Sequence, residues 1–504
     1  MAPVQVPKAP AESGEWELPK YRASFTFEHD GKNSSNAEKG EFFDIKFYPY
    51  SPAGASPVFA AVSKEFVVVC RLNQVFERDR GPCEVLRVIR DEDEEAANCT
   101  CCWTKDPETE RAWLCIAGAD AKVKIYNIAE GKLVKTLVGH GGGINDLATS
   151  PANPWIVASA SDDTTVRIWS LAPAHVQQPC VCLLGGEGHS WDLLSVAFHD
   201  TGRHVLSAGH DQVINLWTIP DLPTEHVDVP IVIHYPQFST SEVHNNLVDC
   251  VAFYGDLILS RACHEDTIVL WRIEGFHSDD PPLLPSQAPT TYDTSKQTRS
   301  AFTPTLSPSR PSHFTRLLQF YTPDCSAQFY MRFKVFHAPD KHPILAFCNA
   351  KSKTMFWDIA RFGAYDHYLA GLRAAIKPGG PPPPVKPSWL TVKRKKKDNV
   401  STLRNLAEGD KDSLVSASPD PETMLTLGGF SQDTLLEWAN LYDASDSHGI
   451  LNPHRMVPID GTAGFVGRQV AWSPEGDWCV VVGNHNRALI YQRWPKDGKA
   501  STPA

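Results

Sequence analysis

The chain has 504 residues and a net charge of −11, from 48 basic and 59 acidic side chains. This charge opposes nonspecific binding to DNA and favours a basic peptide as partner. No run of about eighteen apolar residues occurs, so we expect no membrane-spanning helix.

The N-terminal region is expected to be a tail followed by one strand. Residues 1–20 are rich in Pro, Glu and Ala and lack the apolar core of a signal peptide, so we expect a disordered tail and a reducing compartment. Residues 21–27 alternate in polarity, which predicts a strand.

In a reducing compartment, most of the thirteen cysteines are expected to be small buried hydrophobes. The crowded Cys99, Cys101 and Cys102 lack the paired spacing of zinc ligands, and we expect no metal or cofactor.

Repeated units of four short strands follow this first strand. They cover residues 42–70, 101–126, 139–169, 188–217, 243–271, 329–357 and 470–491. Seven such units are a natural number for closing a ring. The sequence therefore predicts an all-β, seven-bladed β-propeller, and the strand over residues 21–27 is the candidate to complete the last blade.

The third and fourth units share one plan. Each has a Gly-His dipeptide, then a Ser four residues before an Asp, and then a Trp six residues after that Asp. The residues concerned are His140, Ser159, Asp163 and Trp169 in the third unit and His189, Ser207, Asp211 and Trp217 in the fourth. Asp163 and Asp211 fall where a hairpin turn is expected. An Asp there can accept backbone N–H groups and bridge to the imidazole.

Two interpretations fit a recurring set of His, Ser and Asp. One is a hydrolase triad, and the other is a structural hydrogen-bond network that the Trp completes. The set recurs at a fixed period, which a catalytic triad need not do, so the structural interpretation is favoured. Other units keep only part of this pattern. Asp120 lies six residues before Tyr126 in the second unit, and Glu265 lies six before Trp271 in the fifth.

Two long segments interrupt the repeats. Residues 275–312, rich in Pro, Ser, Thr and Asp, indicate a flexible insertion between the fifth and sixth units. Residues 361–455 form a longer insertion, with a predicted helix around Tyr365 to Ile376 and a basic run from Lys393 to Lys397. That run suits a nuclear-localisation signal, a nucleic-acid patch or a solvated loop. The propeller then spans residues 21–495, and a C-terminal tail covers 496–504.

The units resemble the WD repeat, and several stretches are similar to a narrower family. These stretches are Gly-His-Gly at 139–141, Ile-Asn-Asp at 144–146, Gly-Gly-Glu-Gly-His at 185–189, His-Asn-Asn-Leu-Val-Asp-Cys-Val at 244–251, Gly-Asp-Leu-Ile-Leu-Ser at 255–260, Tyr-Met-Arg-Phe at 330–333 and Gly-Arg-Gln at 467–469. They occur in the order found in the embryonic ectoderm development (EED) and extra sex combs family, the propeller subunits of Polycomb repressive complex 2.

The family reads trimethylated lysine of histone H3 through an aromatic cage at one mouth of the central channel. By position, the resemblance implies that Phe43, Phe329 and Tyr330 form the cage. Cys99 stands at the fourth cage position, where the family usually has Tyr, and a cysteine offers no π face. Ring faces attract a quaternary ammonium by roughly 0.5–2 kcal/mol per contact.

Two further positions complete the predicted site. Asn145 and Arg468 align with residues near the bound peptide, and we assign them to peptide backbone contacts. Phe42 is predicted to be a core residue instead, because neighbours on a strand face opposite ways.

The resemblance implies a non-catalytic, nuclear chromatin reader and scaffold. Its expected partners are the methylated histone H3 tail, an Enhancer-of-zeste methyltransferase whose helix lies in a propeller groove, and a suppressor-of-zeste-type subunit. Binding of the mark would then stimulate the methyltransferase allosterically. Sequence-specific DNA binding is not expected.

Two other functions are open to the sequence. An assembly scaffold or substrate receptor without methyl-lysine reading is the alternative that Cys99 supports. An enzyme is disfavoured, because the sequence contains no G-x-S-x-G, H-E-x-x-H or phosphate-loop motif.

Overall fold

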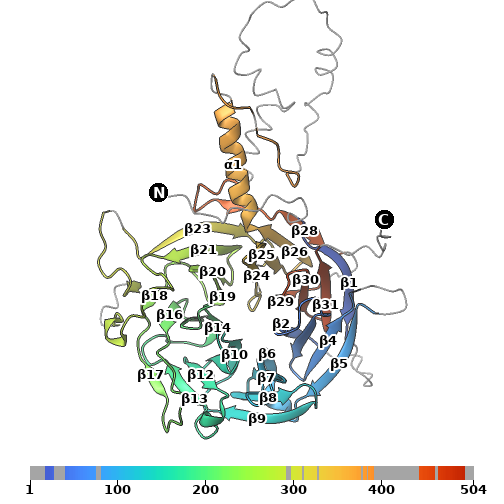
Figure 1. Cartoon of the computed structure of the whole chain (residues 1–504), viewed down its shortest axis with the longest axis vertical. Helices are drawn as coiled ribbons and strands as arrows, with labels where there is room; N and C mark the ends of the chain where they lie inside the picture. Colours follow the sequence, from blue (N-terminus) through green and yellow to red (C-terminus); the bar gives the residue numbers. More distant parts are fainter. Residues whose placement is uncertain are drawn as a thin grey trace, which may run out of the picture.

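The computed structural model describes residues 17–27, 40–74, 81–290, 297–308, 311–325, 328–375, 379–382, 384–390, 442–459 and 464–493. Within these residues, seven sheets of four or five strands stand around a common axis (Figure 1). The predicted seven-bladed propeller is therefore confirmed. No helix of the described residues is long and apolar enough to cross a membrane.

The first four blades have these strands, from the axis outward. Blade one contains β2 (Phe42–Phe47), β3 (Val58–Ser63), β4 (Phe66–Leu72) and β5 (Cys83–Arg90). Blade two contains β6 (Asn98–Lys105), β7 (Ala112–Gly118), β8 (Lys122–Asn127) and β9 (Lys132–Val138). Blade three contains β10 (Ile144–Thr149), β11 (Ile156–Ser161), β12 (Val166–Ser170) and β13 (Cys180–Leu184). Blade four contains β14 (Leu193–Phe198), β15 (His204–Gly209), β16 (Ile214–Thr218) and β18 (Phe238–Thr240).

The last three blades follow the same order. Blade five contains β19 (Val248–Tyr254), β20 (Leu257–Ala262), β21 (Thr267–Ile273) and β23 (Phe314–Tyr321). Blade six contains β24 (Lys334–Ala338), β25 (Lys341–Cys348), β26 (Lys353–Asp358) and β28 (Arg455–Pro458). Blade seven contains β29 (Gly467–Trp472), β30 (Trp478–Gly483), β31 (Arg487–Gln492) and β1 (Lys20–Thr26). Short 3-10 turns occupy Glu94–Ala96, Pro173–His175 and Pro285–Gln287.

The N-terminal strand closes the ring. β1 pairs antiparallel with β31, as the alternating pattern over residues 21–27 predicts. The predicted tail over residues 1–20 is too long, however. Leu18 is buried between blades six and seven, and the Arg493 Nε donates to the Glu17 carbonyl oxygen at 3.0 Å. An apolar side chain next to the closing strand gains by packing. Residues 1–16 lie outside the described part.

Both predicted insertions lie inside blades, which corrects the expected position of the first. The segment over 275–312 connects β21 to β23 within blade five, and it contains a strand, β22 (Thr298–Ser300). The segment over 361–455 connects β26 to β28 within blade six. It begins with the predicted helix, α1 (Ile359–Ala375), which extends outward from the ring (Figure 1). The basic run over 393–397 lies outside the described residues.

Three connections cross to the outer edge of the preceding blade. β17 (Ile231–Ile233), from blade four, pairs with β13 of blade three. β22, from blade five, pairs with β18 of blade four. β27 (Ile450–Leu451), from blade six, pairs with β23 of blade five. Each crossing leaves from between the third and fourth strands of its own blade, so the outer rim of blades three to six is joined by strand pairing.

A second set of hydrogen bonds joins the blades next to the axis. A side chain on one innermost strand accepts a backbone N–H from the next blade at about the same height. The pairs are Cys101 to Asp44 at 3.0 Å, Leu147 to Thr100 at 3.1 Å, Val196 to Asp146 at 2.9 Å and Val251 to Ser195 at 3.1 Å. The Gln469 amide of blade seven donates to Asp44 of blade one at 3.0 Å. These bonds fix the position of the innermost strands along the central axis.

Candidate functional site

The repeated His, Ser, Asp and Trp form a hydrogen-bond network in blade three. The Trp169 indole donates to the Ser159 hydroxyl at 2.8 Å, and that hydroxyl lies 2.6 Å from the His140 Nε2. The His140 Nδ1 lies 2.7 Å from an Asp163 carboxylate oxygen, which also accepts the Gly141 N–H. Burial lowers the pKa of His140, so the ring is neutral. Ser159 is fully buried, so no substrate could reach it.

Blades four and five repeat this network. In blade four His189 contacts Asp211 at 2.9 Å and Ser207 at 2.7 Å, and Trp217 donates to Ser207 at 2.8 Å. In blade five His244 contacts Ser260 at 2.7 Å and Glu265 at 2.6 Å, while Trp271 donates to Ser260 at 2.9 Å. A Glu thus replaces the Asp without loss of the bridge. The network ties each hairpin to its own blade and is structural.

A repeated β-bulge places four of the predicted site residues at one mouth of the ring. In six of the seven blades, the pairing of the innermost strand with the second skips one residue near its beginning. The skipped residues are Phe43, Cys99, Asn145, Leu194, Asp249 and Arg468. A bulge re-aims a side chain, and four of these six are predicted site residues.

Three aromatic rings meet at this mouth, which we call the aromatic mouth (Phe43, Phe329 and Tyr330). The ring centroids of Phe43 and Tyr330 are 6.3 Å apart, and those of Phe329 and Tyr330 are 6.5 Å apart. Both pairs are nearly perpendicular, at 74° and 79°. Phe329 is 51% exposed and Tyr330 only 8%. Rings set at right angles with one side open to water can surround part of a cation. Phe42, by contrast, is buried in the core as predicted.

Cys99 lies beside Tyr330 at the fourth predicted cage position. Its thiol donates to the Ile144 carbonyl oxygen at 3.2 Å. Burial raises the pKa of the thiol to about 12, so it is neutral. A neutral thiol that is engaged with the backbone adds neither a charge nor a ring face at this position.

The two predicted peptide-binding residues hold the aromatic mouth together. The Arg468 Nη1 donates to the Phe329 carbonyl oxygen at 2.8 Å, and its Nε pairs with Glu41 at 2.5 Å. The Asn145 amide donates to Asp162 at 2.6 Å and to the Leu193 carbonyl oxygen at 2.7 Å. Through its backbone, Asn145 also accepts the Tyr330 hydroxyl at 2.5 Å. The Arg468 side chain therefore positions Phe329, and the Asn145 backbone positions Tyr330.

Arg332 is a site residue for which no role is predicted from the sequence. It lies on blade six, and its guanidinium reaches across the channel to Asp146 at 2.8 Å and to the Leu194 carbonyl oxygen at 2.6 Å. The guanidinium also lies 4.4 Å from the centroid of the Tyr330 ring. Burial acts against the charge, but Asp146 outweighs it and the pKa of Arg332 is raised. The only signal was its place in the Tyr-Met-Arg-Phe stretch.

A second cation of the chain approaches the aromatic mouth. The Lys64 ammonium, on the hairpin between β3 and β4, lies 5.8 Å from the centroid of the Phe43 ring. Nothing in the residue spacing links Lys64 to Phe43, because the contact depends on the fold of that hairpin. One face of Phe43 and one face of Tyr330 thus already have a positive neighbour.

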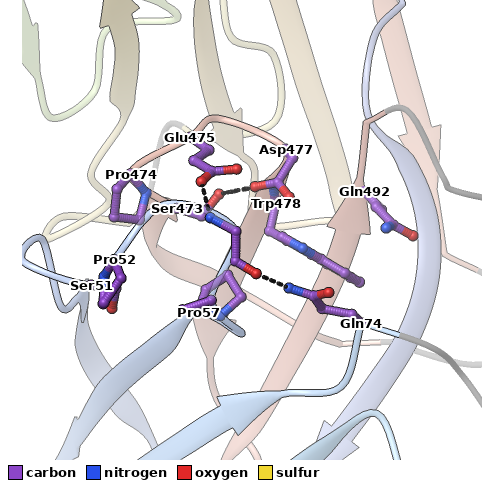
Figure 2. Close-up of a pocket in the computed structure, with 12 residues that line it drawn as sticks. Ser51, Pro52, Pro57, Gln74, Ser473, Pro474, Glu475, Asp477, Trp478 and Gln492 are labelled. Carbon is purple, nitrogen blue, oxygen red and sulfur yellow. Dashed lines mark hydrogen bonds between the residues drawn. The ribbon is translucent and has the colours of Figure 1, made fainter.

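A small cavity of 70 Å³ lies elsewhere, at the seam of blades one and seven (Figure 2). There the Gly54 N–H donates to Glu475 at 2.6 Å, and the Gln74 amide donates to the Gly54 carbonyl oxygen at 3.0 Å. None of the predicted site residues lines it. The first of these bonds joins blades one and seven, whereas the second lies within blade one.

Comparison with known proteins identifies a matching family model and similar proteins. The WD domain, G-beta repeat family model matches residues 131–170 and 180–218. The Polycomb protein EED of Chaetomium thermophilum is 57% identical over 558 residues, which cover 97% of this chain and 98% of that protein. The Polycomb protein esc of Drosophila melanogaster is 28% identical over 286 residues, which cover 54% of this chain and 64% of that protein.

Solved structures give similar matches. A chain of the Chaetomium thermophilum Polycomb repressive complex 2 is 61% identical, with 96% of this chain and 100% of that chain covered and a TM-score of 0.82. A chain in a structure of ctPRC2 in complex with H3K27me3 is 60% identical, with 96% and 100% covered and a TM-score of 0.84.

Proposed function

Because the chain belongs to the EED and extra sex combs family of Polycomb proteins, we propose that it is the reader and scaffold subunit of a Polycomb histone H3 lysine methyltransferase complex. Proteins of this family are propeller subunits and not the catalytic subunit. In the proposed role, the aromatic mouth binds trimethyl-lysine of histone H3, and the rest of the ring holds the partner subunits at chromatin in the nucleus.

The observation that carries the reading role is the meeting of Phe43, Phe329 and Tyr330 at one mouth. A trimethylammonium group cannot donate hydrogen bonds and is cheaply desolvated, whereas ring faces attract it by roughly 0.5–2 kcal/mol each. A similar chain belongs to a structure of ctPRC2 in complex with H3K27me3 and H3K27M, which supports the same ligand. Three walls are enough for selectivity over a bare surface. A bulge orients Phe43, while hydrogen bonds to Arg468 and Asn145 hold Phe329 and Tyr330.

The scaffold role concerns the partner subunits. Similar chains are part of Polycomb repressive complex 2, which supports assembly with the other subunits of that complex. We extend this to an Enhancer-of-zeste helix in a propeller groove and to a suppressor-of-zeste-type subunit. Binding of the mark would then favour the active methyltransferase, and by linkage the active complex would bind the mark more tightly.

One set of observations favours the alternative, a scaffold without methyl-lysine reading. Cys99 leaves one side of the aromatic mouth without a ring. In addition, Arg332 lies against Tyr330, and Lys64 lies near Phe43. Positive charges near the rings oppose a positively charged ligand. The two roles therefore differ in whether the cation–π attraction exceeds this repulsion.

Calorimetry with a histone H3 peptide, trimethylated or unmodified, distinguishes the two roles. We expect the trimethylated peptide to bind more tightly. Substituting Phe43→Ala or Phe329→Ala removes one wall and should weaken its binding roughly tenfold. Leu133→Ala is the matched control, because Leu133 is also 51% exposed but lies on the outer strand β9. Equal affinity for the two peptides would leave only the scaffold.

A further inference from the structure

The channel holds a second cavity behind the aromatic mouth. Its volume is 420 Å³, and it is lined by the later halves of the innermost strands, whereas the aromatic mouth lies where those strands begin. Arg332 lies on its boundary. Phe47, Phe198 and Phe253 line the cavity together with polar side chains, among them Lys46 and Lys334. The cavity thus combines apolar side chains with two ammonium groups.

The Lys334 ammonium has no hydrogen-bond or ion-pair partner among the described residues, although the side chain lines the cavity. The hydrogen bond from the Trp472 indole goes to the Lys334 backbone carbonyl oxygen. Water in the cavity reaches the Lys334 side chain, but the innermost strands surround that cavity on its sides. Burial, and then repulsion by Lys46, lowers the pKa of Lys334. An enclosed ammonium next to a second ammonium is destabilised unless an anion neutralises it.

The nearby carboxylates are already occupied. Asp44 accepts the Cys101 N–H at 3.0 Å and the Gln469 amide at 3.0 Å, and it pairs with Lys46 at 3.2 Å. Lys46 has two further N–H groups that this single contact does not satisfy.

Asp146 is occupied in the same way. It pairs with Arg332 at 2.8 Å and accepts the Val196 N–H at 2.9 Å. Two exposed groups also line the cavity, Asp200 and His337, and neither is paired with the lysines. The cavity lining around the lysines therefore has more positive charge than the protein itself neutralises.

We propose that this cavity binds a small oxyanion between Lys46 and Lys334. The ligand class is a phosphate or carboxylate group, because each presents several acceptor oxygens to two ammonium donors. The volume exceeds that of one such group, and the phenyl rings in the lining can contact a carbon skeleton attached to it. This site does not depend on the proposed reading of methyl-lysine, since it lies on the other side of Arg332.

Inorganic phosphate added to the full chain at constant ionic strength tests the site. A ligand that binds the folded state raises its melting temperature. We expect phosphate to raise the melting temperature of the natural chain more than chloride of the same ionic strength does. Lys334→Met should abolish that difference and weaken phosphate binding in calorimetry at least about tenfold, because one charge-assisted bond is lost.

Two further variants make the result specific. Lys334→Arg keeps the charge and should keep the response to phosphate. Lys132→Met, on the exposed outer strand β9, removes the same charge far from the axis and should behave as the natural chain. The proposal is overturned if Lys334→Met responds to phosphate as Lys132→Met does, or if chloride and phosphate act alike on the natural chain.

Discussion

At the scale of single residues, Arg332 has the most connections in the site. It joins blade six to Asp146 of blade three and to the Leu194 carbonyl oxygen of blade four, and it supports the Tyr330 ring from behind. Arg332 is only 3% exposed, so water cannot replace these contacts. The residue therefore braces the channel and limits how Tyr330 can move.

Replacing Arg332 by Met should destabilise the protein far more than removing a surface arginine. The change leaves the Asp146 carboxylate buried without its cation, which costs about 3–5 kcal/mol of unfolding free energy. Urea denaturation measures the loss. Arg272→Met is the control, because Arg272 pairs with Glu274 on the surface and its loss should cost below about 1 kcal/mol. Similar losses for the two variants would show that the crossing contact is not a brace.

Contacts between residues that are close in sequence could be predicted, whereas contacts between distant residues could not. The spacing of Ser159, Asp163 and Trp169 predicted their hydrogen-bond network, because all three lie on one hairpin. The pairing of Arg332 with Asp146 joins residues 186 positions apart. No local pattern encodes such a contact, since it exists only after the ring has closed.

At the scale of elements, the bulge and the closing strand decide the site. The bulge turns Phe43, Cys99, Asn145 and Arg468 toward one mouth. No residue type in these strands predicts the bulge from the sequence. The strands themselves were predictable from their alternation. The placement of the insertions was not, because an outer strand such as β28 is recognised only by the edge with which it pairs.

Removing residues 1–26 should destabilise the ring, because β1 is the outer strand of blade seven and packs Tyr21 against Tyr491. The edge of β31 would then be exposed, which also favours aggregation. Removing residues 1–16 alone leaves β1 and Leu18 in place and serves as the control. We expect the longer deletion to lower the melting temperature by several degrees at least. Equal melting temperatures for the two truncated chains would contradict a closing role for β1.

At the scale of the whole molecule, the charge of −11 acts on any basic peptide from a distance. Salt screens this attraction beyond roughly 8–10 Å. Added salt should therefore weaken binding of the trimethylated and the unmodified histone H3 peptide alike. The two peptides carry the same charge. Their affinity ratio therefore depends on contacts inside the aromatic mouth and should stay constant.

Calorimetry at two salt concentrations checks this separation of effects. The expected result is a parallel loss of affinity for both peptides with an unchanged ratio. A ratio that falls toward one as salt is added would mean that long-range charge, and not the three rings, accounts for the preference.

The strands that cross between neighbouring blades make the ring stiffer on one side. Blades three to six are coupled both near the axis and at the outer rim, through β17, β22 and β27. Among the described residues, the outer strands β5 and β9 of blades one and two have no such coupling. Phe43 thus belongs to the more compliant arc, and Tyr330 precedes a blade of the stiffer arc. Any movement of blade one relative to blade six would therefore change the gap between these two rings, and with it the width of the opening.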